Sequence, residues 1–420
     1  MRMPASFRAR HPSLRILLRL VLALGVASPA FAASPPNAAG APPALHARSA
    51  ILVEAATGTV LFQQNADQPI PPASLTKLMT LHIALNEIEA GRLDPAEEIV
   101  PGPDSWAKNM PPHSSLMFLG PDQRLSVQRL LEGLVVVSGN DAAVAVAERV
   151  AGSVPAFVAM MNSEAGREGY KVMHFTEPAG LSPANEVTAR EYADFCRVFI
   201  ALHPDALRTL FSLRRFTYPL PENLTNGSRQ EPVTQSNRNT LLGHYEGLDG
   251  LKTGFIDESG YNMAATAVRA GMRLIAVVLG VPDTGGVSGD RLRAIDSAAV
   301  LDYGFSTFTT VAPAYPQPAV VRVWKGRQRT IVPVLSSPPL VVVRRTDAGR
   351  VTAVVEETRE TIAPVRAGQD LGQVSVLLDG RSIARFPLRA ADGVPRGGLL
   401  RRAFDGAALF FRRLFGVSTI

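Results

Sequence analysis

The order of strand and helix patterns in residues 50–305 is the feature that most limits the fold. Near the start, Ala50–Val53 and Thr59–Phe62 are apolar runs on either side of Thr57-Gly58, which predicts two antiparallel strands around a tight turn. Helical patterns follow in the middle, and strand patterns return only near the end. This order predicts an α+β fold with an antiparallel sheet flanked by a cluster of helices. The late strands are expected at Gly247–Thr253, Tyr261–Val268 and Arg273–Val281.

Apolar residues at helical spacing predict a helix from Ser74 to about Ala90, where Gly91 ends it. Beyond Phe305 the pattern changes to short β-type runs that follow the proline-rich stretch Pro313–Pro318. We therefore predict a separate, small all-β domain. The other expected helices are Ser126–Val137, Asp141–Ala151, Pro155–Glu168 and Asp290–Tyr303, and the later strands are Val320–Val323, Thr330–Val334, Leu340–Val343, Val351–Val355, Val374–Leu378 and Ile383–Leu388.

The formal net charge of +6 lies at the two ends of the chain. Residues 1–32 hold five Arg and no acid, and residues 385–420 hold seven Arg against two Asp, so each end carries +5 and the remainder 6 − 5 − 5 = −4. This distribution excludes a basic nucleic-acid-binding body. A single Cys excludes an intramolecular disulfide and a cysteine-cluster metal site, and we expect no metal or cofactor.

The first 32 residues have the pattern of an export signal. Arginines up to Arg19 precede the apolar run Leu20–Ala27, and Ala30-Phe31-Ala32 precedes the expected cleavage after Ala32. The run is short for a membrane span, and an uncleaved anchor is the alternative. The predicted organisation is a signal peptide (1–32), a flexible leader (33–44), a catalytic domain (45–308), an all-β domain (312–392) and an amphipathic helix (396–416).

The C-terminal helix is predicted from two opposed faces. Phe404, Phe411 and Leu414 lie on one side with other apolar residues, and arginines occupy the opposite side; only Leu409 departs from the pattern. Such a helix suits the interface of an anionic membrane, and docking on the protein's own core is the alternative. The arginines concerned are Arg401, Arg402, Arg412 and Arg413.

Three short motifs occur in order along the chain. Ser74-Leu-Thr-Lys77 places a hydroxyl and an amine on one face of a helix start. Ser138-Gly-Asn140 precedes a helix, and an ordinary N-cap at Asn140 is its alternative. Lys252-Thr-Gly254 lies on a strand pattern, where a strand end before a turn is the alternative. Each motif is weak by itself, but finding all three in this order by chance is roughly a one-in-a-thousand event.

Lysine is scarce in this chain, and two of its five lysines stand in these motifs: Lys77 and Lys252, beside 38 Arg. A position that needs only positive charge would be expected to hold Arg. The use of Lys therefore indicates an amine that loses its proton or acts as a compact point charge.

The three motifs together resemble those of penicillin-binding proteins and class A β-lactamases. The neighbouring residues Ala50–Glu54, Pro72–Met79, Asn237–Asn239, Asp249–Gly254 and Gly260–Asn262 resemble the low-molecular-weight D-alanyl-D-alanine carboxypeptidases of peptidase family S11. The resemblance extends over about residues 45–416 and implies a DD-peptidase fold followed by a β domain and a membrane helix. Its implied partners are peptidoglycan peptides ending in D-Ala-D-Ala and β-lactams, and its implied location is the periplasmic face of the inner membrane.

The residues allow a mechanism in which Ser74 is the nucleophile and Lys77 its base, made neutral by burial and by the nearby Lys252 cation. Ser138 relays a proton to the leaving amine, and Lys252 holds its hydroxyl. The resemblance further implies an oxyanion hole from the N–H groups of Ser74 and Phe255. The substrate-binding candidates are Asn140, Lys252, Thr253, Gly254, Phe255, Arg238 and Arg293, with a structural salt bridge as the alternative for each Arg.

Three other functions remain as alternatives. A class A-like β-lactamase needs a deacylating Glu between the second and third motifs, and Glu222 is expected to lie in a surface loop instead. A DD-endopeptidase uses the same active site. A β-lactam or peptidoglycan receptor with slow turnover would be acylated without efficient release. Cys196 is expected in the core and not as a nucleophile.

Overall fold

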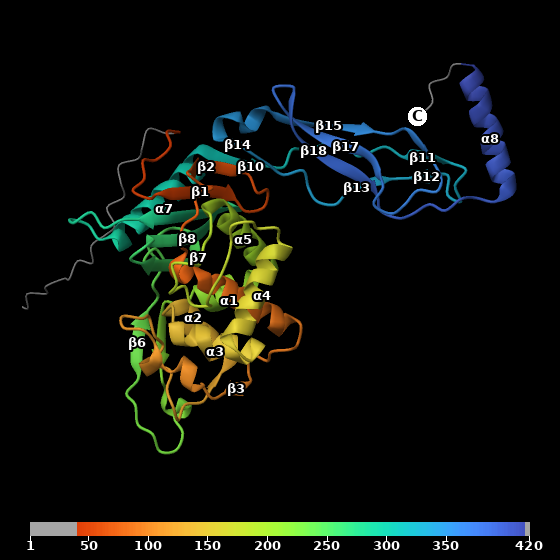
Figure 1. The fold of residues 1–420 in the computed structure, drawn as a ribbon. Coiled ribbons are helices and arrows are strands. Elements are labelled where there is room, and N and C mark those ends of the chain that lie inside the picture. Colours follow the sequence, from red (N-terminus) through yellow and green to blue (C-terminus); the bar gives the residue numbers. More distant parts are fainter. Residues whose placement is uncertain (1–39, 416–420) are drawn as a thin grey trace, which may run out of the picture. The chain divides into compact units, whose positions relative to one another are not determined.

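The computed structural model describes residues 40–415, so the predicted signal peptide and residues 33–39 of the predicted leader lie outside it. Its main sheet is antiparallel with strand order β2-β1-β9-β8-β7 (Figure 1). Early and late strands meet here, since Ser49 of β1 pairs with Leu279 of β9. The strands are β1 (Ser49–Glu54), β2 (Val60–Gln64), β7 (Leu248–Ile256), β8 (Gly260–Arg269) and β9 (Met272–Val281).

Strand β9 shows how the two faces of the sheet are covered. Ile275, Val277 and Leu279 pack into the larger core with the helical cluster, whereas Leu274 and Ala276 pack into a second core. The second core contains Val300 and other residues of α7 (Gly289–Thr307). Successive side chains of a strand point to opposite faces, so this continuous apolar strand is buried on both sides. The predicted α+β fold is confirmed.

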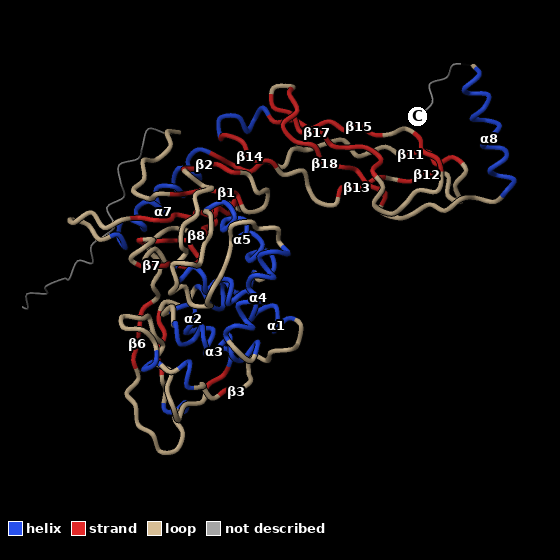
Figure 2. The backbone as a smooth tube through the Cα atoms, viewed as in Figure 1, coloured by secondary structure: helices blue, strands red, loops and turns tan. Residues whose placement is uncertain are grey.

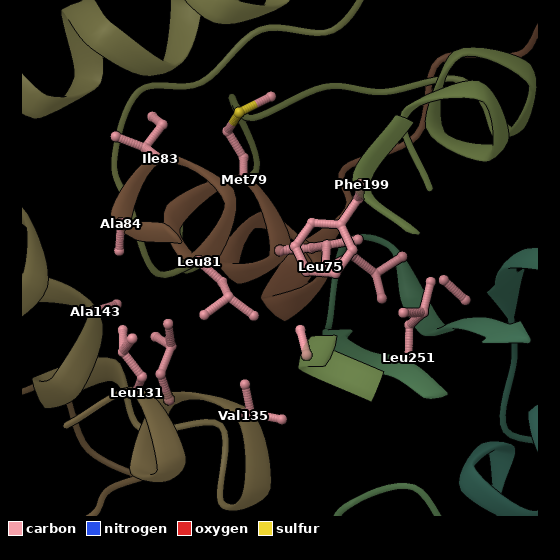
Figure 3. Close-up of a cluster of buried hydrophobic side chains, with 14 of the residues drawn as sticks. Leu75, Met79, Leu81, Ile83, Ala84, Leu131, Val135, Ala143, Phe199 and Leu251 are labelled. Carbon is pink, nitrogen blue, oxygen red and sulfur yellow. The ribbon is translucent and has the colours of Figure 1, made fainter. Parts of the chain in front are cut away.

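Helix α1 (Lys77–Glu89) lies at the centre of the helical cluster (Figure 3). Apolar side chains from the neighbouring helices and from Leu251 of β7 surround it. Every residue of Lys77–Ala84 is buried, including the polar Lys77, Thr80 and His82, so this part of α1 is enclosed on all sides and is not amphipathic. Its neighbours are α2 (Val127–Val136), α3 (Asn140–Ala151), α4 (Val154–Arg167) and α5 (Ala189–Leu202).

The helix starts follow local capping chemistry. The hydroxyls of Ser126, Ser153, Thr188 and Ser288 accept hydrogen bonds from N–H groups in the first turns of α2, α4, α5 and α7. Cys196 of α5 is fully buried, which confirms its predicted place in the core. The smaller elements are α6 (Pro204–Ala206), β3 (Glu98–Ile99), β4 (Leu125–Ser126), β5 (Arg215–Tyr218) and β6 (Val233–Ser236).

After α7 the chain is mostly strands until its last helix (Figure 2). Strand β10, which the sequence patterns did not indicate, pairs with β14. The predicted run Thr330–Val334 is divided at Val332 into β12 and β13, which belong to different sheets. The strands are β10 (Phe308–Val311), β11 (Val321–Trp324), β12 (Thr330–Ile331), β13 (Pro333–Leu335), β14 (Val341–Arg344), β15 (Val351–Glu357), β16 (Glu360–Ile362), β17 (Asp370–Leu378) and β18 (Arg381–Ala390).

Helix α8 (Leu399–Leu414) contacts the β domain through polar groups. The Asp405 carboxylate accepts a hydrogen bond from the Lys325 main-chain N–H (2.6 Å), and the Arg412 guanidinium donates to Glu360 (2.9 Å). The apolar side chains of α8 are exposed: Phe404 by 76%, Phe411 by 55% and Leu414 by 66%. Leu409, the residue outside the apolar pattern, is buried. One arginine predicted to face lipid, Arg412, therefore has a protein partner.

Within residues 40–415, no single helix has the length and apolar character to cross a bilayer. Helices α3 and α4 reach that length and hydropathy together, but an 85° bend separates them.

Candidate active site

Ser74 lies in the 3₁₀ turn Ala73–Thr76, immediately before α1. Lys77 is the first residue of α1, so the two residues of the first motif straddle the helix boundary. Ala73 has φ +51°, a left-handed conformation that is costly for a residue with a Cβ and is typical of functional turns. Ser74 is half-buried, whereas Lys77 is buried, so solvent reaches the hydroxyl and not the amine.

The Lys77 amine has three partners. Its Nζ lies 2.9 Å from Ser74 Oγ, and it donates to Asn140 Oδ1 (2.7 Å) and to the main-chain carbonyl of Ala179 (2.5 Å). The last two oxygens can only accept. A neutral amine has two N–H bonds and one lone pair, so these acceptors take the N–H bonds and leave the lone pair for the Ser74 hydroxyl.

The second motif forms the connection between α2 and α3. Ser138 has φ +62°, and Gly139 precedes the first helical residue, Asn140. The N-cap alternative for Asn140 is wrong, because the cap residue is Gly139 and the Asn140 side chain binds Lys77 instead. The contact between Asn140 and Lys77 therefore brings the second motif next to the turn that carries Ser74.

The third motif lies on β7, the edge strand of the sheet. Lys252 Nζ donates to Ser138 Oγ at 2.8 Å and to the Thr253 carbonyl at 3.2 Å. Gly254 passes beside the nucleophile: a Cβ at this position would lie 2.7 Å from the Pro72 carbonyl oxygen and 3.0 Å from Ser74 N. The glycine of this motif thus allows the strand to approach the Ser74 turn.

Burial is the main cause of the lowered pKa values of the two lysines. It lowers the pKa of Lys77 to about 7, and the nearby carboxylates of Glu177 and Asp141 oppose that shift. The pKa of Lys252 is well below its ordinary value, because of burial first and then because of the Lys77, Arg293 and Arg238 charges. The predicted lowering of the pKa of Lys77 is thus present and is caused by burial, whereas the charges that act most on Lys77 are those of Glu177 and Asp141 and not the Lys252 cation named in the prediction.

The remaining predicted site residues differ in accessibility. Thr253 is buried, whereas Phe255 is 44% exposed. The centroid of the Phe255 ring lies 4.3 Å from the centroid of the Tyr261 ring. Arg238 is exposed, and its charge acts on Lys252. Arg293 is buried and donates to the Gly254 carbonyl (2.8 Å) while it pairs with Asp290. Arg293 therefore supports β7 from within the protein, which favours its salt-bridge alternative.

Two acids near Lys77 were missed by the motif analysis. Asp141 follows Asn140 directly and accepts hydrogen bonds from the main-chain N–H groups of Met117, Phe118 and Leu119 (2.9–3.0 Å). Glu177 lies in a loop whose distance from α1 no sequence pattern reveals. The position of Asp141 beside the second motif was the only available signal. Glu222 is exposed in a short 3₁₀ turn, as expected.

Comparison with known proteins identifies the family of this chain. The family model described as D-alanyl-D-alanine carboxypeptidase, peptidase S11, matches residues 36–283, which include all three motifs. The chain belongs to this family. It is thus a serine-type carboxypeptidase of the penicillin-binding protein class, as the motifs predicted. A second model, the C-terminal domain of penicillin-binding protein 5, matches residues 308–396.

Individual relatives agree with this assignment. The carboxypeptidase is 34% identical over 381 residues to the D-alanyl-D-alanine carboxypeptidase DacC of Escherichia coli, covering 89% of this chain and 90% of that protein. The structure of penicillin-binding protein 5 from Haemophilus influenzae is similar, with a TM-score of 0.74, 32% identity, and coverage of 85% and 99%. Penicillin-binding protein D2 from Listeria monocytogenes, solved in the ampicillin-bound form, is 28% identical with a TM-score of 0.53, covering 64% and 100%.

Proposed function

We propose that this carboxypeptidase removes the terminal D-Ala of peptidoglycan pentapeptides through an ester on Ser74. Lys77 accepts the Ser74 proton while Oγ attacks the carbonyl of the penultimate D-Ala. The peptide C–N bond then breaks, free D-Ala leaves, and water hydrolyses the ester. The observation that carries this proposal is the set of three partners around Lys77 Nζ, which suits a neutral amine with its lone pair on Ser74.

The proton that Lys77 takes from Ser74 has to reach the departing amine, and we assign this transfer to the second serine. Ser138 relays a proton to the departing amine, and Lys252 holds the Ser138 hydroxyl through the 2.8 Å contact. Asn140 would bind a substrate amide as well as Lys77. This division of roles requires that Ser138 reach both the reacting bond and Lys252, which its place between α2 and α3 supports.

Substrate binding is proposed along the start of the nucleophile turn and strand β7. The N–H groups of Ser74 and Phe255 would bind the oxyanion, a role supported by the close passage of Gly254 beside Ser74 N. Lys252, Thr253 and the exposed Arg238 would bind the terminal carboxylate. Arg293 would act indirectly, through its hydrogen bond to the Gly254 carbonyl.

Acylation by β-lactams follows from the same nucleophile, and it provides the direct test. Labelled penicillin should mark one peptide, the one that contains Ser74, and the Ser74→Ala variant should carry no label. Labelling of that variant would contradict the assignment. The Cys196→Ala variant is the matched control, because Cys196 is a buried core residue that belongs to none of the three motifs, and its loss should leave labelling in place.

The substrate separates carboxypeptidase action from the alternatives. Purified mature protein should release free D-Ala from a soluble pentapeptide at a rate that exceeds its hydrolysis of penicillin. Cleavage of cross-linked dimers without D-Ala release would favour an endopeptidase. Rapid penicillin hydrolysis would favour a β-lactamase, and stable labelling without turnover of either substrate would favour a receptor.

We also propose that export and α8 place the enzyme on the periplasmic face of the inner membrane, with the β domain between membrane and catalytic domain. The predicted domain boundaries (45–308, 312–392 and 396–416) accord with this organisation. Support comes from the exposed apolar face of α8, including Phe404, Phe410 and Phe411, beside the exposed Arg413. Arg412 is not counted here, because Glu360 binds it.

Membrane attachment can be tested with vesicles that contain phosphatidylglycerol. The mature protein should sediment with them, and a chain truncated before Gly397 should not. Phe404→Ser with Phe411→Ser should also release it, because these exposed rings supply the apolar binding. High salt should weaken attachment only in part. A truncated protein that still sediments, or that loses activity on small peptides, would contradict the proposal.

A further inference from the structure

The loop from Glu177 to Ser182 is organised by one carboxylate. Glu177 Oε2 accepts from the Ala179 N–H (2.7 Å), and Oε1 accepts from the N–H groups of Gly180 (2.6 Å) and Leu181 (2.8 Å). Asn185 Nδ2 donates to the same Oε1 at 2.9 Å. A carboxylate that accepts several N–H bonds within one turn fixes the direction of each peptide group in that turn.

This loop is joined to the start of α1 by three hydrogen bonds. Lys77 Nζ donates to the Ala179 carbonyl, Thr80 Oγ1 donates to the Pro178 carbonyl (2.7 Å), and Asn185 Nδ2 donates to Thr76 Oγ1 (3.1 Å). All three partners on the α1 side follow Ser74 within two helical turns. The loop therefore contacts the nucleophile turn as a unit, not through Lys77 alone.

Steric contact makes the same junction rigid. Gly180 has φ +82°, and a Cβ there would lie 1.9 Å from the Ala73 carbonyl oxygen and 2.8 Å from Ser74 N. Backbone packs on backbone at this point, so the Ala179 carbonyl has little freedom to move away from Lys77.

The Glu177 carboxylate is bound by its own loop. Oε1 accepts from the N–H groups of Gly180 and Leu181 and from the Asn185 amide, and Oε2 accepts from the Ala179 N–H. These hydrogen bonds hold the carboxylate within the turn, which suits a structural role.

We propose that Glu177 is a positioning residue for Lys77. It fixes the Ala179 carbonyl, which together with Asn140 Oδ1 takes both N–H bonds of the neutral amine and so directs the lone pair at Ser74 Oγ. This inference rests on the proposed role of Lys77 as the base.

The charges around Lys77 predict how the loss of Glu177 would change the pKa of Lys77. Glu177 makes the largest charge contribution that raises the pKa of Lys77, followed by Asp141 on α3, and both oppose the lowering by burial. Lys252 on β7 belongs to the same group of charges, because the charges of Lys77, Arg293 and Arg238 all act to lower its pKa. Removal of the Glu177 charge should therefore lower the pKa of Lys77 further and keep the amine neutral in more acidic solution.

The test compares Glu177→Gln with Glu186→Gln in the full mature chain. Glu186 is an exposed acid at the far end of the same loop region, so its change removes an equal charge without touching the Ala179 turn. The second-order rate of acylation by labelled penicillin is measured from about pH 5 to about pH 9. Glu177→Gln should lower the plateau by roughly tenfold and move the acidic midpoint down by about half a pH unit, and Glu186→Gln should do neither.

Other outcomes are decisive in the opposite direction. A Glu177→Gln profile with an unchanged midpoint would overturn the inference, whether or not the plateau falls. If this variant does not fold, Glu177→Asp replaces it: this variant keeps the charge and shortens the reach, so a wild-type midpoint with a reduced plateau supports the inference and an unchanged plateau overturns it. Failure of the proposed function is distinct, because Lys77→Arg would then retain near-normal acylation.

Discussion

The active site contains two serine–lysine pairs, which come from different kinds of structural element. Ser74 and Lys77 are three residues apart at the start of one helix, whereas Ser138 and Lys252 come from a helix connection and a sheet edge. Their Nζ–Oγ distances are nearly equal, 2.9 and 2.8 Å. Both lysines are buried. The hydrogen bond itself therefore does not distinguish the two pairs.

The surroundings distinguish them. Lys77 lies near the carboxylates of Glu177 and Asp141, which keep its pKa at about 7 despite burial. Lys252 lies near cations, which add to burial in disfavouring its charged form until an anion enters. The first pair is thus suited to proton exchange near neutral pH, and the second to binding a substrate carboxylate. Since burial is common to both lysines, neighbouring charge and not contact distance distinguishes the roles that we propose for them.

The largest effect on this comparison is expected from Ser74→Ala, which removes the only hydroxyl proposed to form the ester. D-Ala release and acylation should both fall to background, as measured with pentapeptide and labelled penicillin. Ser138→Ala serves as the comparison, because it should still become labelled, though slowly. Equal loss of labelling in both variants would mean that the two serines do not have separate roles.

Lys77→Arg should have the next largest effect. Arginine keeps a cation but offers no accessible neutral form, so acylation should fall by about 10²–10⁴-fold. Single-turnover acylation kinetics measure this change. The matched variant, Lys252→Arg, keeps the charge that the second pair needs and should lose less. A larger loss in Lys252→Arg would reverse the assignment of base and anion-binding lysine.

Ser138→Ala should slow D-Ala release by roughly 100-fold, since it removes the relay to the leaving amine and leaves Lys252 without its hydroxyl partner. Steady-state release and the rate of ester hydrolysis, measured separately, show which step depends on the relay. Unchanged rates in both steps would show that Ser138 only supports Lys252.

The pH dependence of the acylation rate should follow the titration of Lys77 in the first pair. Lys77 acts as a base only when neutral, so the acylation rate should rise through a pKa of about 7 and fall about tenfold for each pH unit below it. A rate profile for small peptides, recorded with folding monitored in parallel, checks this. A profile that declines as pH rises through neutrality would indicate that the charged form of Lys77 is the active one.

The smallest effect should come from Arg238→Gln. The side chain is exposed, so its contact with a substrate carboxylate is worth about 1 kcal/mol or less, and KM should rise only a few-fold with kcat nearly unchanged. Steady-state kinetics on the pentapeptide give both constants. A large fall in kcat would instead place Arg238 in the bond-breaking step.

Much of the fold was predictable because its patterns are local. The continuous apolar run of β9 and the helical spacing in α1 follow from the sequence directly. Strand β10 was missed because it has only a few residues and is specified by its partner β14. Among the site residues, Ser74, Lys77, Ser138 and Lys252 stood out through their motifs. Glu177 could not, since a single acid in a loop has no pattern and its importance depends on which helix the loop meets.

The pairing of β1 with β9 has a consequence for how the active site forms during synthesis of the chain. The nucleophile and its base are made early, but the strand that carries Lys252 and the strand that pairs with β1 come much later in the chain. A chain whose synthesis stops before residue 281 therefore holds Ser74 and Lys77 without a complete sheet. Reaction with penicillin should for this reason report that the whole catalytic domain has been made and has folded.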